Sequence, residues 1–165
     1  MITRASKILL VTGIALLYTL VVFNNLTDFD SNYQFVRHVL SMDSTFPGNH
    51  GLWRALPWSW EHLTFYLVII AWETGTTLLL WWGILRMLHA RRAASSQFHR
   101  AKAVAIAGLT TAMLLFLVGF LSIGAEWFLM WQSRTWNGQD AAFRMFAVAG
   151  IVLLYLVQPE TDFQP

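Results

Sequence analysis

Residues 103–132 read AVAIAGLTTAMLLFLVGFLSIGAEWFLMWQ, and this stretch decides the class of fold. Its only charged residue is Glu126. A helix of about 20 apolar residues crosses the hydrocarbon core of a bilayer, so this stretch can span a membrane and must tilt or protrude. Three other apolar stretches, at about residues 8–26, 62–88 and 141–158, qualify or nearly do. The sequence therefore predicts an all-α integral membrane protein, a four-transmembrane-helix bundle forming one transmembrane domain over residues 1–165.

The composition supports a membrane protein and excludes several other classes. The chain is 56% hydrophobic and 12% charged, whereas soluble domains are about 45–50% apolar and about 25% charged. Nine tryptophans fit the boundary between acyl chains and water, which indole rings favour. The net charge of +2 is too small, and the basic residues too clustered, to indicate a nucleic-acid partner. Without cysteine the chain has no disulfide, thiolate metal site or cysteine nucleophile.

The distribution of Lys and Arg predicts that the N- and C-termini are cytoplasmic, because cytoplasmic loops carry the excess of these residues. The terminal segments and the loop at 86–102 hold seven of them: Arg4, Lys7, Arg86, Arg91, Arg92, Arg100 and Lys102. The two outer loops and their flanks hold four: Arg37, Arg54, Arg134 and Arg144.

The first outer loop, residues 27–61, contains a predicted amphipathic helix. Ser31 and Gln34 have the spacing of a capping box. Apolar residues then follow at helical spacing, at Phe35, Val36, Val39 and Leu40, opposite a polar face that includes Gln34, Arg37 and His38. This pattern predicts a short interfacial helix, lying either on the membrane surface or over the mouth of the bundle.

The second span carries a polar stripe around one deep carboxyl group. Glu73 lies eleven residues after His62, about 16 Å along a helix, and almost three full turns place the two on one face. Tyr66 and Thr77 share that face. Ionisable groups inside a bilayer are costly, so Glu73 with His62, Tyr66 and Thr77 is a candidate ligand or proton site. The alternative is a structural role, in which Glu73 bonds to a neighbouring helix and holds the bundle in register.

The third span carries a stripe of small residues, which permits close helix–helix approach: Ala101, Ala105, Gly108, Ala112, Gly119 and Ser122. Glu126 continues this stripe, so we expect it to face protein. Arg144 lies one turn into the fourth span, at comparable depth in an antiparallel pair. Glu126 and Arg144 are therefore predicted to form a structural ion pair.

No pattern indicates a cofactor, a metal site or a catalytic residue. The five histidines lie in or beside loops, not on facing helices where they could bind a haem. An outer-face metal site built from His38, His50 or His62 would lack any ligand-spacing motif. Glycine-rich phosphate loops, nucleophile elbows and His-Glu-x-x-His motifs are also missing.

Two segments resemble a known bacterial family. They are residues 24–47, NNLTDFDSNYQFVRHVLSMDSTFP, and residues 124–144, GAEWFLMWQSRTWNGQDAAFR. Both are similar to signature segments of predicted small integral membrane proteins, domain of unknown function 2165, and the similarity runs through the whole chain. The resemblance implies a four-helix membrane protein of a bacterial inner membrane and supplies no catalytic residues.

The sequence favours a non-enzymatic role, as an accessory or assembly subunit of a larger envelope complex. Its expected partners are the lipid bilayer and either another membrane protein or further copies of itself. One alternative is a small-molecule or proton-linked carrier or receptor that uses Glu73. Another is a membrane enzyme that acts on lipid or quinone at the outer mouth, although no nucleophile–base pair supports it.

Overall fold

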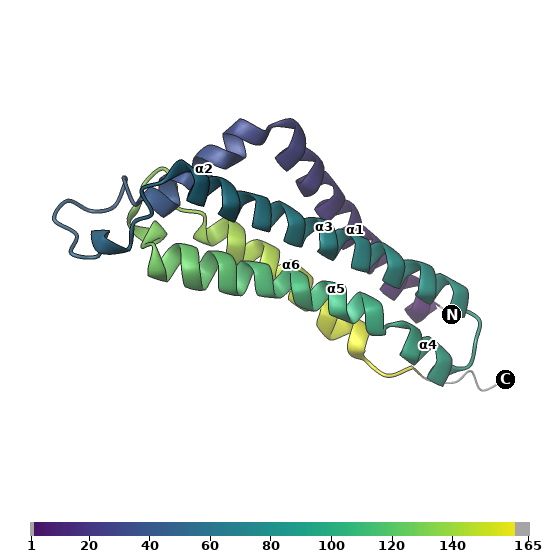
Figure 1. Ribbon diagram of the computed structural model, residues 1–165. Coiled ribbons are helices and arrows are strands. Elements are labelled where there is room, and N and C mark those ends of the chain that lie inside the picture. Colours follow the sequence, from purple (N-terminus) through teal and green to yellow (C-terminus); the bar gives the residue numbers. More distant parts are fainter. Residues whose placement is uncertain (1, 161–165) are drawn as a thin grey trace.

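The computed structural model describes residues 2–160, which are mainly helical and contain no strand. The elements in chain order are α1 Ile2–Thr27, α2 Phe29–Ser41, η1 Leu52–Arg54, α3 Ser59–Ala90, α4 Ser95–Ala101, α5 Ala103–Leu114, η2 Leu115–Trp127, η3 Met130–Gln132 and α6 Gln139–Val157 (Figure 1). Four helical stretches are long and apolar enough to cross a membrane: Ile2–Thr27, Ser59–Ala90, Ser95–Trp127 and Gln139–Val157. The predicted all-α fold with four spans is confirmed.

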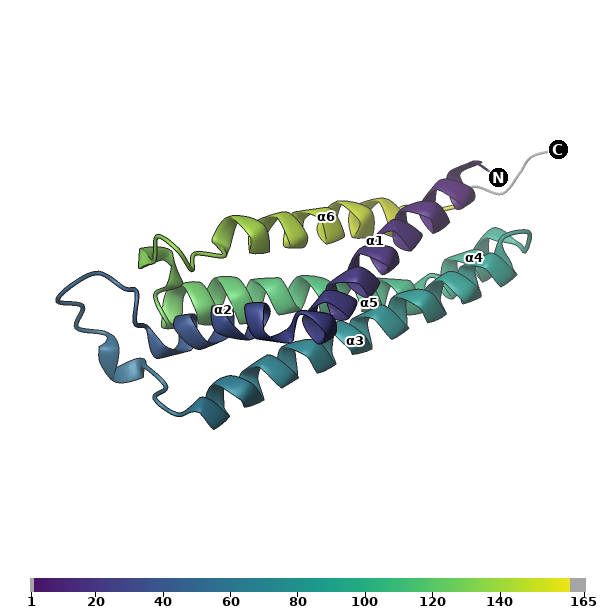
Figure 2. The same cartoon turned by 90° about the horizontal axis from the view of Figure 1, so that it is seen from above.

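The four spans run along one long axis and bring both termini to the same end as α4 (Figures 1 and 2). The continuous α5–η2 rod lies beside α6 in both views, and α3 packs against α5 on one side and α1 on the other. The loop that contains η1 lies at the opposite end, together with α2. We call the end with α4 the inner end and the end with η1 the outer end.

The α3–α5 contact depends on small residues, as the sequence predicted. A Cβ atom added to Gly83 would lie 2.6 Å from the Ala105 backbone nitrogen, so the two helices approach almost to backbone contact. Gly108 packs in the same way, since a Cβ atom added there would lie 3.0 Å from the Leu80 side chain. Close approach of backbones is what drives helix association where lipid already solvates apolar side chains. Ala101, Ala105, Gly108 and Ala112 are all buried in the described structure.

Beyond Leu114 the helix changes type, and this overturns the rest of the predicted small-residue stripe. Residues Leu115–Trp127 form a π-helix, whose hydrogen bonds run between residues five apart. Phe128 N accordingly donates to Ile123 O at 3.0 Å. The wider turns rotate successive side chains away from an α-helical stripe. Ser122 and Glu126 are therefore exposed, although α-helical spacing predicted that they face protein.

The predicted amphipathic helix exists as α2, and it lies over the bundle. Val36, Val39 and Leu40 are buried in an outer apolar cluster with Ile70 of α3 and Phe128. The predicted capping box is wrong, because α2 begins at Phe29 and Ser31 lies inside its first turn. Helix α1 ends only two residues earlier, so the chain enters α2 through a sharp bend rather than an extended capped entry.

Candidate functional site

A buried polar cluster joins α1 to α3 inside the bundle. Glu73 is 3% exposed, and its Oε2 accepts a hydrogen bond of 2.6 Å from Asn25 Nδ2. The Tyr66 hydroxyl donates to the backbone carbonyl of Asn25 at 3.1 Å. Among residues 2–160 no cation forms an ion pair with Glu73. The carboxyl group therefore depends on a neutral amide donor within a low-dielectric bundle, where a charged form is disfavoured.

Tyr18 adds a polar group that the sequence analysis missed. Its side chain is 1% exposed, and its hydroxyl has no hydrogen-bond partner within the described chain. Asn25, which was also missed, lies seven residues after Tyr18, so the two share a face of α1. That spacing could have identified both residues. A buried hydroxyl without a partner is costly, which makes this a place where a bound polar group would be stabilised.

The structure divides the predicted polar stripe of α3 into separate parts. Tyr66 and Glu73 both form hydrogen bonds with Asn25. His62 instead bonds to the outer loop, where its Nε2 donates to the Leu56 carbonyl at 2.8 Å. Thr77 bonds at 2.8 Å to the backbone carbonyl of Glu73, within its own helix. The candidate site therefore consists of Glu73 and Tyr66 from the predicted set, extended by Asn25 and Tyr18 from α1.

A charged cluster lies at the inner end, where the sequence analysis recognised an excess of basic residues but no partner for them. Lys7 Nζ and Lys102 Nζ both donate to Glu160 Oε1, at 2.5 and 3.2 Å, and both lysine side chains are fully buried. Arg4 lies 3.8 Å from the same carboxylate. Burial raises the pKa of Glu160, but hydrogen bonds and charge from the two lysines lower it by more, so this pKa lies below its ordinary value. The cluster closes the inner end of the bundle around the last described residue.

The predicted ion pair between Glu126 and Arg144 is absent from the structure. Both side chains are exposed, and neither belongs to an ion pair in the described region. The physical reason is the π-helix, which shifts Glu126 out of the register that an unbroken α-helix would give it.

The polar face of α2 forms short local contacts. Gln34 Nε2 donates to Asp30 at 3.2 Å, and Arg37 donates to Gln34 Oε1 at 3.2 Å. His38 Nδ1 lies 2.7 Å from Asp43, and its ring stacks on Trp136 at 4.6 Å between centroids. Within residues 2–160 no three His, Asp or Glu side chains come together in an arrangement that could hold a metal ion.

The fold defines the class of protein as a four-span, all-α integral membrane protein. The chain belongs to the family described as Predicted small integral membrane protein (DUF2165), whose family model matches residues 3–159. Searches of curated proteins and of solved structures returned no match.

Proposed function

We propose that this protein is a non-enzymatic accessory or assembly subunit, and that it binds a larger envelope complex through its outer end. We further propose that it resides in a bacterial inner membrane. The observation that carries the proposal is the ordered outer surface formed by residues 42–56 and 127–136, which we call the outer platform. Connections longer than about 12–15 residues are uncommon in compact domains and are usually functional when ordered.

Hydrogen bonds between its two segments hold the outer platform together. The Phe46 backbone nitrogen and Asn49 Nδ2 both donate to Gln132 Oε1, each at 3.1 Å. Ser44 Oγ donates to Ser133 Oγ at 2.8 Å. The backbone of Leu56 bonds to α2 at 2.9 Å, which ties the platform to the bundle. A surface fixed by such long-range bonds presents one defined shape to a partner, which lowers the entropy cost of binding.

The outer platform also exposes large aromatic side chains. Phe46 is 53% exposed and Trp53 is 73% exposed, and the neighbouring Trp58 and Trp60 are exposed as well. Tryptophan and other aromatic residues are enriched both at membrane interfaces and in the central contacts of protein–protein interfaces. Hydrogen bonds fix the backbone of the outer platform, and its exposed aromatic rings are available for contact. Both features suit a surface that binds a protein at the membrane boundary.

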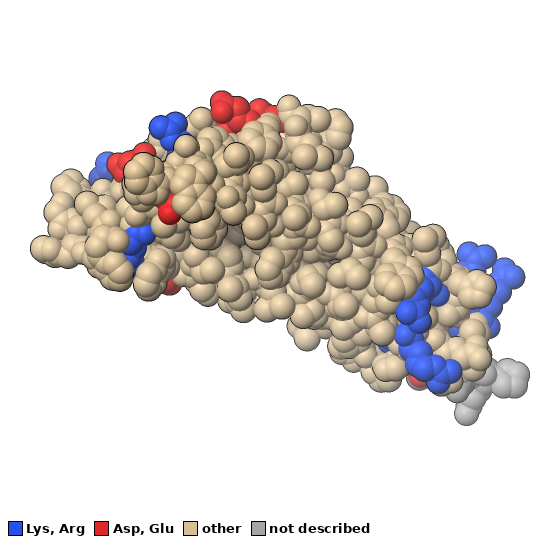
Figure 3. Space-filling model, in the orientation of Figure 1, with Lys and Arg blue, Asp and Glu red and all other residues tan. Residues whose placement is uncertain are grey.

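The charge distribution supports cytoplasmic termini. In Figure 3, Lys and Arg gather at the inner end, whereas the outer end carries acidic and basic groups together and the surface between them is uncharged. The positive-inside rule assigns such a basic end to the cytoplasm. Reporter fusions at Ser95 are expected to be cytoplasmic, and fusions at Gly48 and Gly138 periplasmic. A periplasmic reading at Ser95 would reverse the proposed orientation and place the outer platform in the cytoplasm.

Photo-crosslinking in intact cells tests the proposed docking surface. A crosslinking residue replaces Phe46 on the outer platform, and the matched control replaces Leu154, which is 67% exposed on the side of α6. We expect one defined protein adduct from position 46 and only lipid or diffuse products from position 154. The absence of an adduct at position 46, or the same adduct at both positions, would refute docking through the outer platform.

The polar cluster supports a second candidate, a carrier or receptor that handles a proton or small polar ligand at Glu73. The buried Tyr18 hydroxyl, which has no hydrogen-bond partner within the described chain, favours it, because Tyr18 lies on the face of α1 that carries Asn25, the donor to Glu73. The Glu73→Gln variant keeps the side-chain shape and its bonding to Asn25 while removing titration. A variant that folds normally but loses the cellular function would support the second candidate. A fully active variant would leave Glu73 with a structural role only.

A further inference from the structure

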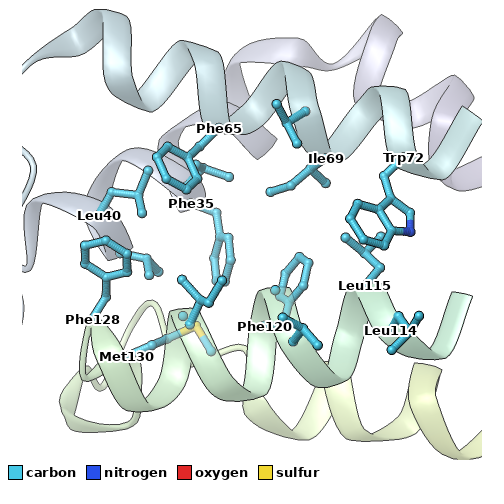
Figure 4. A pocket seen from close by; sticks show the side chains of 17 residues that line it. Phe35, Leu40, Phe65, Ile69, Trp72, Leu114, Leu115, Phe120, Phe128 and Met130 are labelled. Atoms are coloured by element: carbon cyan, nitrogen blue, oxygen red, sulfur yellow. The ribbon is translucent and has the colours of Figure 1, made fainter. Parts of the chain in front are cut away.

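An apolar groove lies between α3 and the α5–η2 rod, beneath α2 (Figure 4). Its volume is about 180 Å³, and its walls include Phe65, Trp72, Leu114, Phe120 and Met130. Trp72 carries a polar atom, but its indole N–H already donates to the Thr111 carbonyl at 3.0 Å. An engineered apolar cavity of about 150 Å³ stays dry and takes up hydrocarbon, so water is a poor occupant of this one.

The groove opens sideways toward the bilayer. Val68 on the α3 wall is 54% exposed, and Val118 on the η2 wall is 43% exposed, although both line the groove. Phe65, Trp72 and Leu114 are about equally accessible at 40–41%. Both walls belong to membrane-spanning helices, so the surrounding hydrocarbon is made of acyl chains. A lipid chain can enter without passing through water.

At its outer end the groove continues into a second hollow, lined mainly by aromatic and other apolar side chains. Phe65, Ile123 and Phe128 line both spaces. The hollow has a volume of about 600 Å³ and adds two side chains of opposite charge, Arg54 and Glu61. The apolar groove thus leads to charged groups at the level of the aromatic residues that mark the membrane boundary. This arrangement suits an amphipathic molecule with its tail in the groove and its headgroup in the hollow.

Arg54 is held in place without a carboxylate. Its Nη1 donates to the Trp127 carbonyl at 3.2 Å, and its guanidinium lies 5.0 Å from the Trp127 ring and 5.3 Å from the Trp53 ring. Within the described chain its Nε is buried without a hydrogen-bond partner, and Arg54 forms no ion pair. A planar guanidinium held this way is well suited to a phosphate oxygen, which can accept two of its N–H groups.

Glu61 supplies the opposite charge in the same hollow. One of its oxygens, Oε2, accepts the Trp58 backbone N–H at 3.1 Å at the start of α3, which fixes the side chain. The two charged groups of the hollow are therefore separately anchored and do not neutralise each other. Together they match a zwitterion that carries a phosphate and an ammonium group.

We propose that this groove and hollow bind one phosphatidylethanolamine molecule, with an acyl chain in the groove, the phosphate on Arg54 and the ammonium group at Glu61. The bound lipid fills the outer half of the α3–η2 interface. Arg54 belongs to the outer platform, so the headgroup lies within the proposed docking surface. The lipid site goes beyond the docking role proposed above, and lipid binding by the purified chain does not depend on a protein partner.

Native mass spectrometry of the full chain, released from vesicles of phosphatidylethanolamine, phosphatidylglycerol and phosphatidylcholine in equal parts, tests the site. The wild type is expected to retain one phosphatidylethanolamine molecule in preference to the other two lipids. The Arg54→Gln variant is expected to weaken retention about tenfold, because it loses a charge-assisted bond. Glu61→Gln is expected to abolish the preference for ethanolamine over the other headgroups while some lipid remains bound.

Two further variants separate the site from general effects on folding. Val118→Trp is expected to fill the exposed groove and remove bound lipid of every class, while the helix content and melting of the protein stay as in wild type. Arg144→Gln removes an exposed arginine outside the hollow and is expected to retain lipid as wild type does. Equal retention by the wild type and Arg54→Gln, or equal amounts of all three lipids on the wild type, would overturn the proposal.

Discussion

Replacing Gly83 with alanine tests how closely α3 and α5 approach. The added Cβ atom would lie 2.6 Å from the Ala105 backbone nitrogen and 2.7 Å from its Cα atom, well inside the contact distance of real side chains. Because these neighbours are backbone atoms, no rotamer change can relieve the clash, and the helices must separate. Overpacking of this kind costs about 1–3 kcal/mol. Gly83→Ala is therefore expected to lower the free energy of unfolding despite the better helix propensity of alanine.

Gly75 provides the matched control on the same helix. A Cβ atom added there meets nothing within 4 Å, so Gly75→Ala receives only the propensity gain of about 0.5–1 kcal/mol. The propensity gain is common to both variants, and the difference between them isolates the steric cost of about 1–3 kcal/mol. Equilibrium unfolding in mixed detergent micelles, followed by helix content, measures both. Equal stability of Gly83→Ala and Gly75→Ala would refute the close α3–α5 contact.

Alanine at Asn25 or at Glu73 is expected to cost about 1–3 kcal/mol each, because the partner is left buried and unsatisfied. The double variant should lose less than the sum in the same unfolding assay, and strict additivity would contradict their bond. Glu160 has a lowered pKa in the folded protein, so its contribution to stability is present above its ordinary value of 4.5 and is lost as the pH falls through the lower folded value. Thermal melts against pH should show a smaller acid loss in Glu160→Gln, and an unchanged acid limb would contradict the inner cluster. Glu126→Gln and Arg144→Gln are each expected to shift stability by less than about 0.5 kcal/mol. Their effects should add in the double variant. A measurable interaction energy between them would show that the two side chains do form an ion pair and would contradict the structure.

The number of spans and the family were both readable in the sequence. Hydropathy over about 20 residues is a local property, and the bilayer imposes that length regardless of which helices later meet. The apolar face of α2 was predicted for the same reason, since its period depends on neighbouring residues alone. The predicted start of α2 was wrong. Ser31 and Gln34 have the spacing of a capping box, but the helix begins at Phe29, directly after the bend that follows Thr27.

The π-helical segment shows where local reasoning fails. Small residues up to Ala112 lie on the buried face, as α-helical spacing predicts, but from Leu115 onward the spacing no longer applies. The amino-acid composition of this segment does not indicate a π-helix, whose hydrogen bonds join residues five apart. The exposure of Glu126 could therefore not be predicted from the sequence. The sequence determined that this span is a helix, whereas the change from α-helix to π-helix at Leu115 is visible only in the tertiary structure, where the π-helical part packs against α6.

Which polar and charged side chains bond to one another was decided by the tertiary structure alone. Asn25 and Glu73 lie 48 positions apart, and Lys7 and Glu160 lie 153 positions apart. Basic residues near helix ends were correctly recognised as a group at one end of the bundle, but their burial around a single carboxylate was not. Hydropathy and periodicity determine which face of each helix is apolar. Which polar groups meet depends on the crossing and axial register of whole helices, and these follow from backbone contacts such as Gly83 with Ala105.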